Sequence, residues 1–448
     1  MSKDLETLTA ALLQAATRAG ADAADAMALD GTALGIDTRG GRLEQAERAE
    51  GLEFGLRVLI GQRSAVVSGS DARPEVLAAM AERAVAMARE APEDPYIGLA
   101  DPALLARDVD AAALELFDPA AEPSPAELEQ DAREAEAAAQ AVRGVTQVDG
   151  ASAHYSATRV HLAATNGFSG GYTRSSRSIS CVAIAGSGLG MERDHDGDTR
   201  IFAADLRGAA EIGTRAGERA VERLSPRKPR TGAYPVIFDE RISGSLIGHL
   251  AAAINGSAIT RGASWLRDAM GEQVLPAALS LIEDPRRVRA PSSRPFDAEG
   301  LPTRARALVQ DGVLQGWSLD LATARKLGLA PTGNAARGTS SAPSPTAWNL
   351  DLTQGGQSRA ELIAETGRGL LVTSMIGSTI NPNTGDYSRG AAGFWIENGE
   401  IAYPVSGVTL AGNLREMLLS LTPANDARPW LSRVVPSLRV EGLTLAGE

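Results

Sequence analysis

The sequence GFWIENGEIAYPV, residues 393–405, shows which kind of sheet this chain forms. Two runs of apolar and aromatic residues flank Asn398-Gly399, a dipeptide that strongly favours the tight turn of a β-hairpin. A second hairpin is predicted in ALVQDGVLQGW, residues 307–317, around Asp311-Gly312. Strands that come in hairpin pairs form antiparallel sheets, so a doubly wound parallel sheet is not expected.

The N-terminal part alternates helices with paired strands. Leucines recur at helical spacing after Asp4, which can cap a first helix, and a second helix is predicted after Pro74. Between them, apolar and polar residues alternate in three runs separated by Gly40-Gly41 and Gly61, which predicts a small antiparallel sheet. Ser124 and Glu127 have the spacing of a capping box that opens a third helix.

Four strand-like runs follow, with turns expected at Asp149-Gly150, Asn166-Gly167 and Asp196-Gly197, and then a helix near residues 209–224. Residues 225–231 (SPRKPRT) are the clearest linker. The predicted fold is therefore α+β: two smaller N-terminal α/β units with antiparallel sheets, at residues 1–105 and 106–225, followed by a large β-rich C-terminal domain at residues 226–448.

Charge and composition exclude several classes of function. The 448 residues include 44 Lys and Arg against 56 Asp and Glu, a net charge of −12 with no basic run, so nucleic acid is not an expected ligand. No apolar stretch approaches the roughly 20 residues that span a bilayer, and the first residues do not resemble a signal peptide. Cys181 is the only cysteine, which excludes an internal disulfide. We expect a cytoplasmic protein that does not bind membranes.

Two glycine-rich segments have the residue types of catalytic motifs but lack the secondary structure that those motifs require. Residues 186–190 (GSGLG) half resemble a dinucleotide loop, but Met191 follows them and no helix is predicted after them. Residues 167–171 (GFSGG) match a nucleophile elbow around Ser169, but a strand follows where the elbow requires a helix. Both are predicted to be hairpin turns.

Acidic, histidine and cysteine residues of the second unit also suggest no site. Asp194, Asp196 and Asp198 have a spacing similar to that of a calcium loop, but the glycine at its sixth position is missing, so a solvated acidic turn is predicted. His154 and His161 are seven apart in a strand and should lie on opposite faces. Cys181 lies in an apolar strand with no nearby cation, which argues against a catalytic thiolate.

His249 lies in the predicted helix ISGSLIGHLAAAINGSA, residues 242–258. A helical zinc protease places two histidines one turn apart, with a glutamate directly after the first as general base. Here Leu250, Ala253 and Ile254 occupy the positions where those groups would be, and none of them can bind a metal or move a proton. His249 alone cannot build a zinc site.

Four segments of the C-terminal half resemble the TldD/PmbA family. They are NGSAITRGASWLRDAMGEQVLP (255–276), ARGTSSAPSPTAWNLDL (336–352), GLLVTSMIG (369–377) and NPNTGDYSRGAAGFWIENGEIAYPVSGVTLAGNLREML (381–418). The N-terminal helix, the RVLIGQRSAVVSG hairpin and the second unit also fit in order, so the resemblance covers nearly the whole chain. Within the family, the chain looks like the PmbA (TldE) branch.

The resemblance implies a division of labour between two chains. TldD-type members are similar to zinc proteases, with a His-Glu-x-x-x-His helix and a cysteine near the C-terminus. On that pattern His249 matches the first histidine, Leu250 replaces the glutamate and Ile254 replaces the second histidine, and no cysteine follows Cys181. We therefore expect no catalytic residue and no metal in this chain. The resemblance implies a heterodimer with a TldD-type partner that holds zinc and processes or degrades peptides.

The segment 377–393 is the candidate for substrate binding, because its polar groups can contact an extended peptide beside a strand edge. Its candidate residues are Asn381, Thr384, Asp386, Tyr387, Ser388 and Arg389. The alternative interpretation, that this segment is a hairpin connector with a purely structural role, has equal weight.

Three functions remain open from the sequence. The first is the non-catalytic subunit of a cytoplasmic two-component zinc peptidase. The second is a homodimeric peptide-binding or chaperone-like module without protease activity. The third is a hydrolase that uses Ser169 or another nucleophile.

Overall fold

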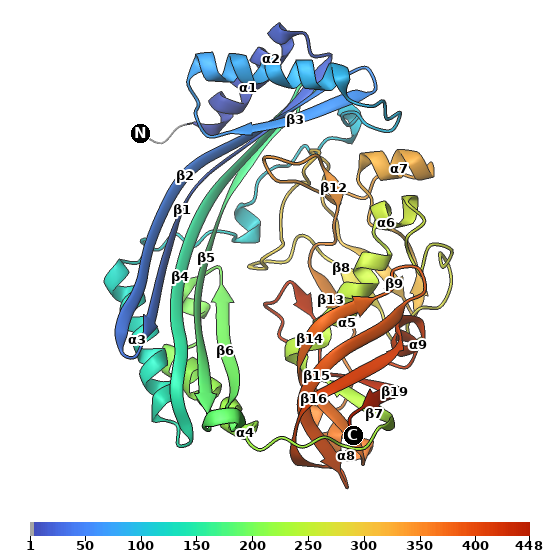
Figure 1. Cartoon of the computed structure of the whole chain (residues 1–448). Helices are drawn as coiled ribbons and strands as arrows, with labels where there is room; N and C mark the ends of the chain where they lie inside the picture. The colour runs from blue at the N-terminus through green and yellow to red at the C-terminus, as the bar shows by residue number, and fades with distance from the viewer. Residues whose placement is uncertain (1–3) are drawn as a thin grey trace.

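The computed structural model describes residues 4–448 and confirms the α+β class. Its N-terminal half is a six-stranded antiparallel sheet that arches beside the C-terminal domain (Figure 1). The strand order is β3-β2-β1-β4-β5-β6. These strands are β1 (Ala23–Arg39), β2 (Arg42–Ile60), β3 (Arg63–Gly69), β4 (Val145–Ala164), β5 (Ser169–Ala185) and β6 (Glu192–Arg200).

The sheets of the two N-terminal units are joined into one. Strand β1 of the first unit pairs antiparallel with β4 of the second, from Asp25 opposite Ala164 to Thr38 opposite Ala151. Two pairs of helices cover the two ends of this arch and bury separate apolar cores. These helices are α1 (Leu5–Ala19), α2 (Pro74–Glu90), α3 (Pro125–Ala141) and α4 (Ala209–Glu222).

The local helix signals are confirmed. The Asp4 side chain accepts a hydrogen bond from the Glu6 amide at 3.2 Å and caps α1. Ser124 and Glu127 form the capping box of α3 in both directions. Residues 167–168 lie in the β4–β5 connection and Ser169 begins β5, while residues 186–190 lie in the β5–β6 connection, so both glycine-rich segments are at hairpin turns as predicted.

Two of the expected turns in the second unit are wrong. Asp149-Gly150 lies inside β4, where a bulge between Val148 and Gly150 absorbs the irregularity, and Asp196-Gly197 lies inside β6. Only Asn166-Gly167 turns the chain between strands. The four expected runs are therefore three long strands, because hydrogen bonding to a neighbouring strand overrides the weak turn preference of an isolated Asp-Gly.

The acidic run is also not a solvated turn. Asp194, Asp196 and Asp198 point from β6 towards a buried layer and are at most 7 % exposed. Arg207, just before α4, and Arg219 of α4 both pair with Asp196, at 2.8 and 2.7 Å. The alternation of a strand places all three carboxylates on one face, where arginines in and around α4 and from α5 compensate their burial.

The C-terminal domain contains a sheet that closes on itself. Its order is β16-β15-β14-β7-β19-β17, and β16 also pairs with β19. The strands are β7 (Gly232–Phe238), β14 (Gly369–Ile380), β15 (Asp386–Glu397), β16 (Glu400–Asn413), β17 (Thr422–Pro423) and β19 (Leu438–Ala446). The Asn398-Gly399 turn joins β15 to β16, with both residues in the left-handed region at φ 54° and 78°.

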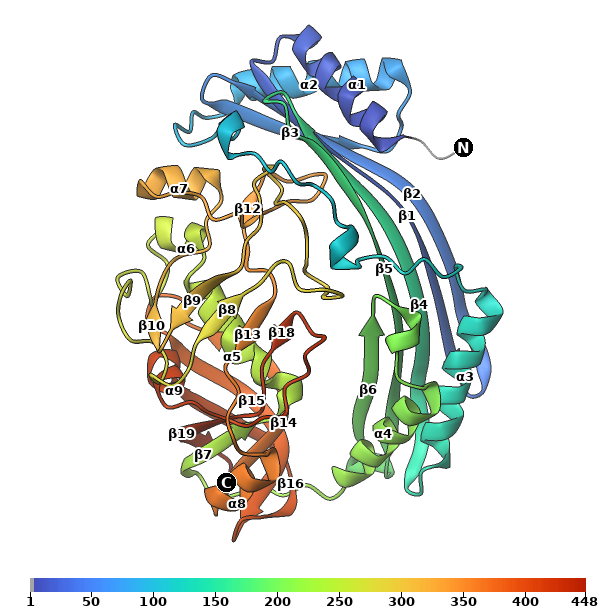
Figure 2. The ribbon, with the colours of Figure 1, turned by 180° about the vertical axis from the view of Figure 1, so that it is seen from behind.

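A second sheet, of order β10-β9-β8-β13-β18, lies beside the first. Helix α5 (Glu240–Ala253) packs in the largest apolar core of the chain, to which both sheets contribute (Figure 2). The second sheet consists of β8 (Leu281–Glu283), β9 (Arg306–Gln310), β10 (Val313–Leu314), β13 (Leu350–Leu352) and β18 (Arg433–Val434). The Asp311-Gly312 hairpin between β9 and β10 is confirmed.

Short elements complete the domain. They are the β11–β12 pair (Ala335–Ala336 and Ser344–Pro345) and the helices α6 (Gly256–Thr260), α7 (Leu321–Leu327), α8 (Arg359–Thr366) and α9 (Leu414–Leu419). Among residues 4–448, no helix has both the length and the apolar character that crossing a membrane requires.

Buried ion pairs join the two halves of the chain. Asp25 of β1 is 3 % exposed and bonds to Arg57 of β2 and to Arg337, which lies beyond β11. Arg241 in the first turn of α5 pairs with Asp194 of β6 at 3.1 Å. These contacts hold the arch against the domain that carries α5.

Candidate functional site

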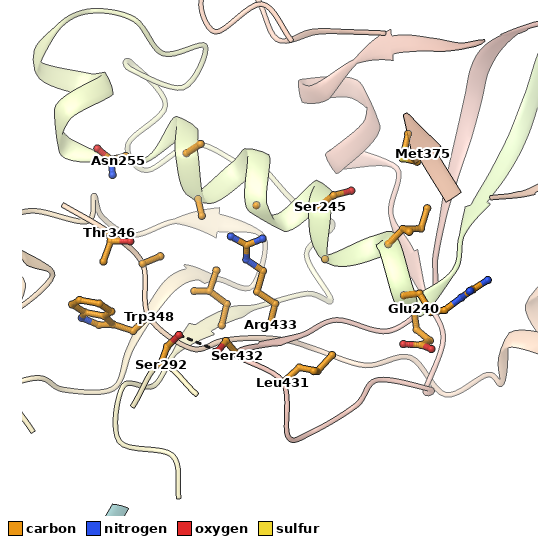
Figure 3. A pocket seen from close by; sticks show the side chains of 18 of the residues that line it. Glu240, Ser245, Asn255, Ser292, Thr346, Trp348, Met375, Leu431, Ser432 and Arg433 are labelled. Carbon is orange, nitrogen blue, oxygen red and sulfur yellow. Dashed lines mark hydrogen bonds between the residues drawn. The ribbon is translucent and has the colours of Figure 1, made fainter. Parts of the chain in front are cut away.

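Helix α5 has an apolar face and a face of small residues. Asp239 caps its N-terminus by accepting the Arg241 amide at 3.1 Å. Leu246, Ile247 and Leu250 recur at the spacing of one helical face and are fully buried in the core. The opposite face carries Gly244, Ser245, Gly248, Ala251 and Ala252, and these residues line a cleft of about 750 Å³ (Figure 3).

The cleft is closed on its other sides by residues from distant parts of the chain. Arg389 and Met375 come from the β14–β15 hairpin, and Leu431 to Arg433 come from the segment that enters β18. Trp348 and Thr346 form the far wall beside Asn255 (Figure 3). Ser292 also lines the cleft, which is therefore a junction of five segments that are far apart in the sequence.

The three helix positions expected to bear the metal motif differ in their surroundings. Leu250 and Ile254 are completely buried among apolar side chains. His249 is half-buried, its ring centroid lies 6.0 Å from that of Tyr387, and its Nε2 is buried without a hydrogen-bond partner among the described residues. Burial, reinforced by the charges of Arg389 and Arg433, lowers the pKa of His249, so the imidazole is neutral at neutral pH.

These residues do not fit a zinc ion. Structural and catalytic zinc sites need at least three nitrogen, sulfur or oxygen ligands, and aliphatic carbon supplies none. Within residues 4–448, no group of three or more His, Cys, Asp and Glu side chains is arranged to hold a metal. Cys181 is buried in β5, its pKa is raised to about 12 by burial, and its thiol faces the Ala135 carbonyl of α3.

The cleft has a positive wall. Its one carboxylate from the described part of the chain, Glu240, is neutralised by Arg428, whose Nε lies 2.6 Å from the Glu240 Oε2. Arg241 is paired with Asp194 and Asp239. Two further guanidinium groups, those of Arg389 and Arg433, line the same cleft, and within residues 4–448 neither forms an ion pair with a carboxylate.

The predicted substrate-binding residues do not lie together. Asn381, Thr384 and Asp386 are exposed at the tip of the β14–β15 hairpin, where they mainly bond to the turn itself, with the Thr384 hydroxyl donating to Asp386 at 2.6 Å. The Asp386 carboxylate also accepts a hydrogen bond from the Asn413 side chain at 3.1 Å.

The other three residues lie further along β15. Tyr387 is 2 % exposed in the core, and burial raises its pKa to about 12. Ser388 is half-buried. Arg389 alone reaches the cleft, where its Nε donates to the Gly377 carbonyl at 2.7 Å.

Ser169 has part of the arrangement that a serine hydrolase requires. Its hydroxyl lies 3.4 Å from Nε2 of His161, and Nδ1 of the same ring lies 2.9 Å from the Thr9 hydroxyl. A serine hydrolase requires a carboxylate in that third position and a strained turn that presents the serine. Ser169 instead begins β5 and pairs with Ala163 in a regular ladder.

Comparison with protein families decides the relationship. Residues 231–447 match the PmbA/TldA metallopeptidase C-terminal domain, residues 118–224 match its central domain, and residues 24–88 match its domain 1. The chain belongs to the PmbA/TldD metallopeptidase family. Its relatives place it in the PmbA branch of that family.

Those relatives cover almost the whole chain. The metalloprotease PmbA of Escherichia coli O157:H7 is 37 % identical over 95 % of this chain and 93 % of its own length. A PmbA homolog of Haemophilus influenzae is 34 % identical over 95 % of this chain and 92 % of its own length. The TldD homolog of the same organism is only 27 % identical and matches 52 % of this chain and 47 % of its own length.

Solved structures agree on the fold of this PmbA-branch chain. The crystal structure of a Bacteroides thetaiotaomicron protein, named as a proposed modulator of DNA gyrase, has a TM-score of 0.92 and 26 % identity over the full length of both chains. TldE from Thermococcus kodakarensis has a TM-score of 0.85 at 21 % identity, covering 98 % of this chain and all of its own, and shows the shared fold alone.

Sequence reasoning missed most of the cleft. The one local signal was the pair Gly244 and Gly248 on α5, since two glycines four apart remove side chains from one helical face. Nothing in the sequence indicated that Arg433 or Trp348 would reach this face.

Proposed function

We propose that this chain is the non-catalytic subunit of a cytoplasmic two-component zinc peptidase, which pairs with a TldD-type chain that holds the zinc and cleaves peptides. The observation that carries the proposal is the burial of Leu250 in α5 and of Ile254 at the C-terminal cap of that helix. At the two positions where the family pattern has a base and a second metal ligand, this chain has apolar core residues.

The rest of the cleft supports the proposal that this chain can bind a peptide but lacks the groups that would cleave it. The cavity has room for several amino-acid residues, and its walls carry both polar groups and the apolar surfaces of Trp348, Met375 and Leu431. A cleft with this lining can position a peptide, while bond cleavage requires a base and an activated water that the partner supplies. Arg389 remains our candidate for substrate contact, and the turn residues Asn381, Thr384 and Asp386 remain a prediction.

The test is reconstitution. The chain and a TldD-type chain from the same cell are purified separately and together, and cleavage of a peptide mixture is followed by mass spectrometry. We expect cleavage by the mixed pair only, and a complex of one copy of each chain by size-exclusion chromatography with light scattering. Cleavage by this chain alone, at a rate unaffected by a metal chelator, would contradict the proposal.

One variant and one mixing experiment distinguish the alternatives. If the chain acts as a hydrolase through Ser169, Ser169→Ala abolishes its activity, whereas our proposal expects the mixed pair to be unaffected. If the chain is a homodimeric peptide-binding module, it stays a homodimer when an equimolar TldD-type chain is added, and no mixed complex forms.

A further inference from the structure

Two guanidinium groups that have no carboxylate partner within residues 4–448, those of Arg389 and Arg433, lie in one cleft. Arg389 comes from β15 and Arg433 from the start of β18, and both side chains line the cleft beside the small-residue face of α5. Figure 3 shows the Arg433 guanidinium pointing across the cleft towards α5. Two cations that line one cleft without a counter-charge repel each other, and an anionic ligand between them removes that cost.

The helix makes room for one of these groups. A Cβ added at Gly248 would lie 3.0 Å from Nη1 of Arg433, tighter than ordinary contact, so the glycine allows the guanidinium to lie against the helix backbone. At Gly244 an added Cβ would meet the Cβ of Arg433 at 3.7 Å. The small-residue face of α5 thus accommodates the Arg433 side chain and leaves the rest of the cleft open.

Some of the other polar groups of the cleft already have hydrogen-bond partners within the chain, and others do not. Asn255 donates to the Pro345 carbonyl at 2.6 Å, and the Ser292 and Ser432 hydroxyls bond to each other at 3.0 Å. The Ser245 hydroxyl, which lines the cleft, is buried without a partner in the described chain. Buried polar atoms are normally satisfied, so the Ser245 hydroxyl is available to a ligand or to its bound water.

We propose that this cleft binds a carboxylate group of a peptide, held between the guanidinium groups of Arg389 and Arg433. Arginine pairs with carboxylates through two parallel hydrogen bonds, which fixes the orientation of the ligand as well as its charge. The inference rests on the proposed function, because that function makes a peptide the ligand. The carboxylate is either the C-terminus of the peptide or an acidic side chain within it.

The test measures binding to the purified chain without its partner. The probes are three fluorescein-labelled octapeptides of alanine, glycine and serine: one with a free C-terminal carboxylate, one with an amidated C-terminus, and one amidated with a single internal glutamate. We expect at least one of the two charged peptides to bind at least about tenfold more tightly than the neutral amide, with an affinity that falls as salt rises. The peptide that binds identifies the source of the carboxylate.

Variants locate the site. Arg433→Gln and Arg389→Gln are each expected to weaken binding of the charged peptide about tenfold and to leave the neutral peptide unchanged. Arg433→Lys keeps the charge and should retain part of the affinity. Arg267→Gln, at an exposed arginine that pairs with its neighbour Asp268, is the matched control and should bind as the wild type does.

The inference is overturned if the neutral amide binds the wild-type chain as tightly as both charged peptides, or if neither charged peptide binds at millimolar concentration. It is also overturned if both glutamine variants melt at the wild-type temperature and bind the charged peptide unchanged. Any of these results leaves cleavage by the mixed pair as a separate question, so failure here and failure of the proposed function can be told apart.

Discussion

Two pairs of arginines in this molecule have opposite surroundings. At the junction of the two halves, Arg57 and Arg337 share the buried carboxylate of Asp25. In the cleft, Arg389 and Arg433 line one cavity, and neither is paired with a carboxylate of residues 4–448. The first arrangement is complete within the chain and should matter for stability. The second lacks its counter-charge and should matter for binding.

The largest expected effect comes from breaking the complete cluster. Although burial raises the pKa of Asp25, the charges of Arg57 and Arg337 outweigh it and lower the pKa, so the carboxylate is ionised at neutral pH. Asp25→Ala leaves two buried guanidinium groups unpaired and should reduce the free energy of unfolding by about 3–5 kcal/mol. Urea denaturation followed by circular dichroism measures this, with exposed Asp268→Ala as the control. A change below about 0.5 kcal/mol would show that the cluster is not structural.

The second effect compares the two faces of α5. Leu250 is fully buried, so Leu250→Ala should cost about 2–5 kcal/mol through lost burial and a cavity. Ser245→Ala on the cleft face removes a hydroxyl that has no partner within the described chain and should change stability by less than about 0.5 kcal/mol. Equal losses for the two variants would mean that the core face and the cleft face of this helix are not distinct.

A third prediction concerns pH at the junction. Burial and the carboxylates of Asp297 and Asp320 raise the pKa of Glu299 well above its usual value. A carboxyl with a raised pKa in the folded state stabilises the fold fully below its unfolded pKa, roughly 4.3, and that contribution is lost as the pH rises. Glu299→Gln should therefore be more stable than the wild type at pH 8, by about 1 kcal/mol or more, and should lose that advantage at pH 4.

The measurement for Glu299 is urea denaturation at both pH values, with exposed Glu272→Gln as the control. The Glu299 carboxylate accepts the Leu321 amide at 2.8 Å, and the amide oxygen of glutamine can keep that bond. The same difference between Glu299→Gln and wild type at pH 4 and pH 8 would contradict the assigned direction of the pKa shift.

The smallest effect on stability is expected for Arg389 and Arg433, the two arginines of the cleft that have no carboxylate partner within residues 4–448. Because Arg433 forms no ion pair with a carboxylate of the described chain, Arg433→Gln should change the free energy of unfolding by less than about 0.5 kcal/mol. A thermal denaturation series of the wild type, Arg433→Gln and Arg389→Gln checks this. A loss of several kcal/mol would place Arg433 with the structural arginines and remove the contrast between the two pairs.

Features that depend on a few neighbouring residues could be predicted from the sequence. The cap at Asp4, the capping box of Ser124 and the hairpin at Asn398-Gly399 each depend on local backbone and side-chain geometry. The sequence also shows directly that residues 250 and 254 are apolar, and the structure adds that both side chains are buried in the core.

Features that depend on distant partners could not be predicted. The joining of two expected sheets rests on β1 pairing with β4, across more than a hundred residues. The acidic residues of β6 were predicted to form a solvated turn because their arginine partners, Arg207 before α4 and Arg219 within it, lie in a different segment with a helical rather than a strand pattern. Arg433 reaches the cleft only because β18 pairs in parallel with β13, a register that no local motif specifies.

The central claim is that α5 of this chain cannot hold a catalytic metal. The most direct measurement is the zinc content of the purified chain after dialysis against micromolar zinc and then buffer, by plasma mass spectrometry, with the TldD-type chain treated in parallel. We predict less than one tenth of an equivalent for this chain and about one equivalent for the TldD-type chain. One equivalent of zinc in this chain that is lost in His249→Ala would contradict the account.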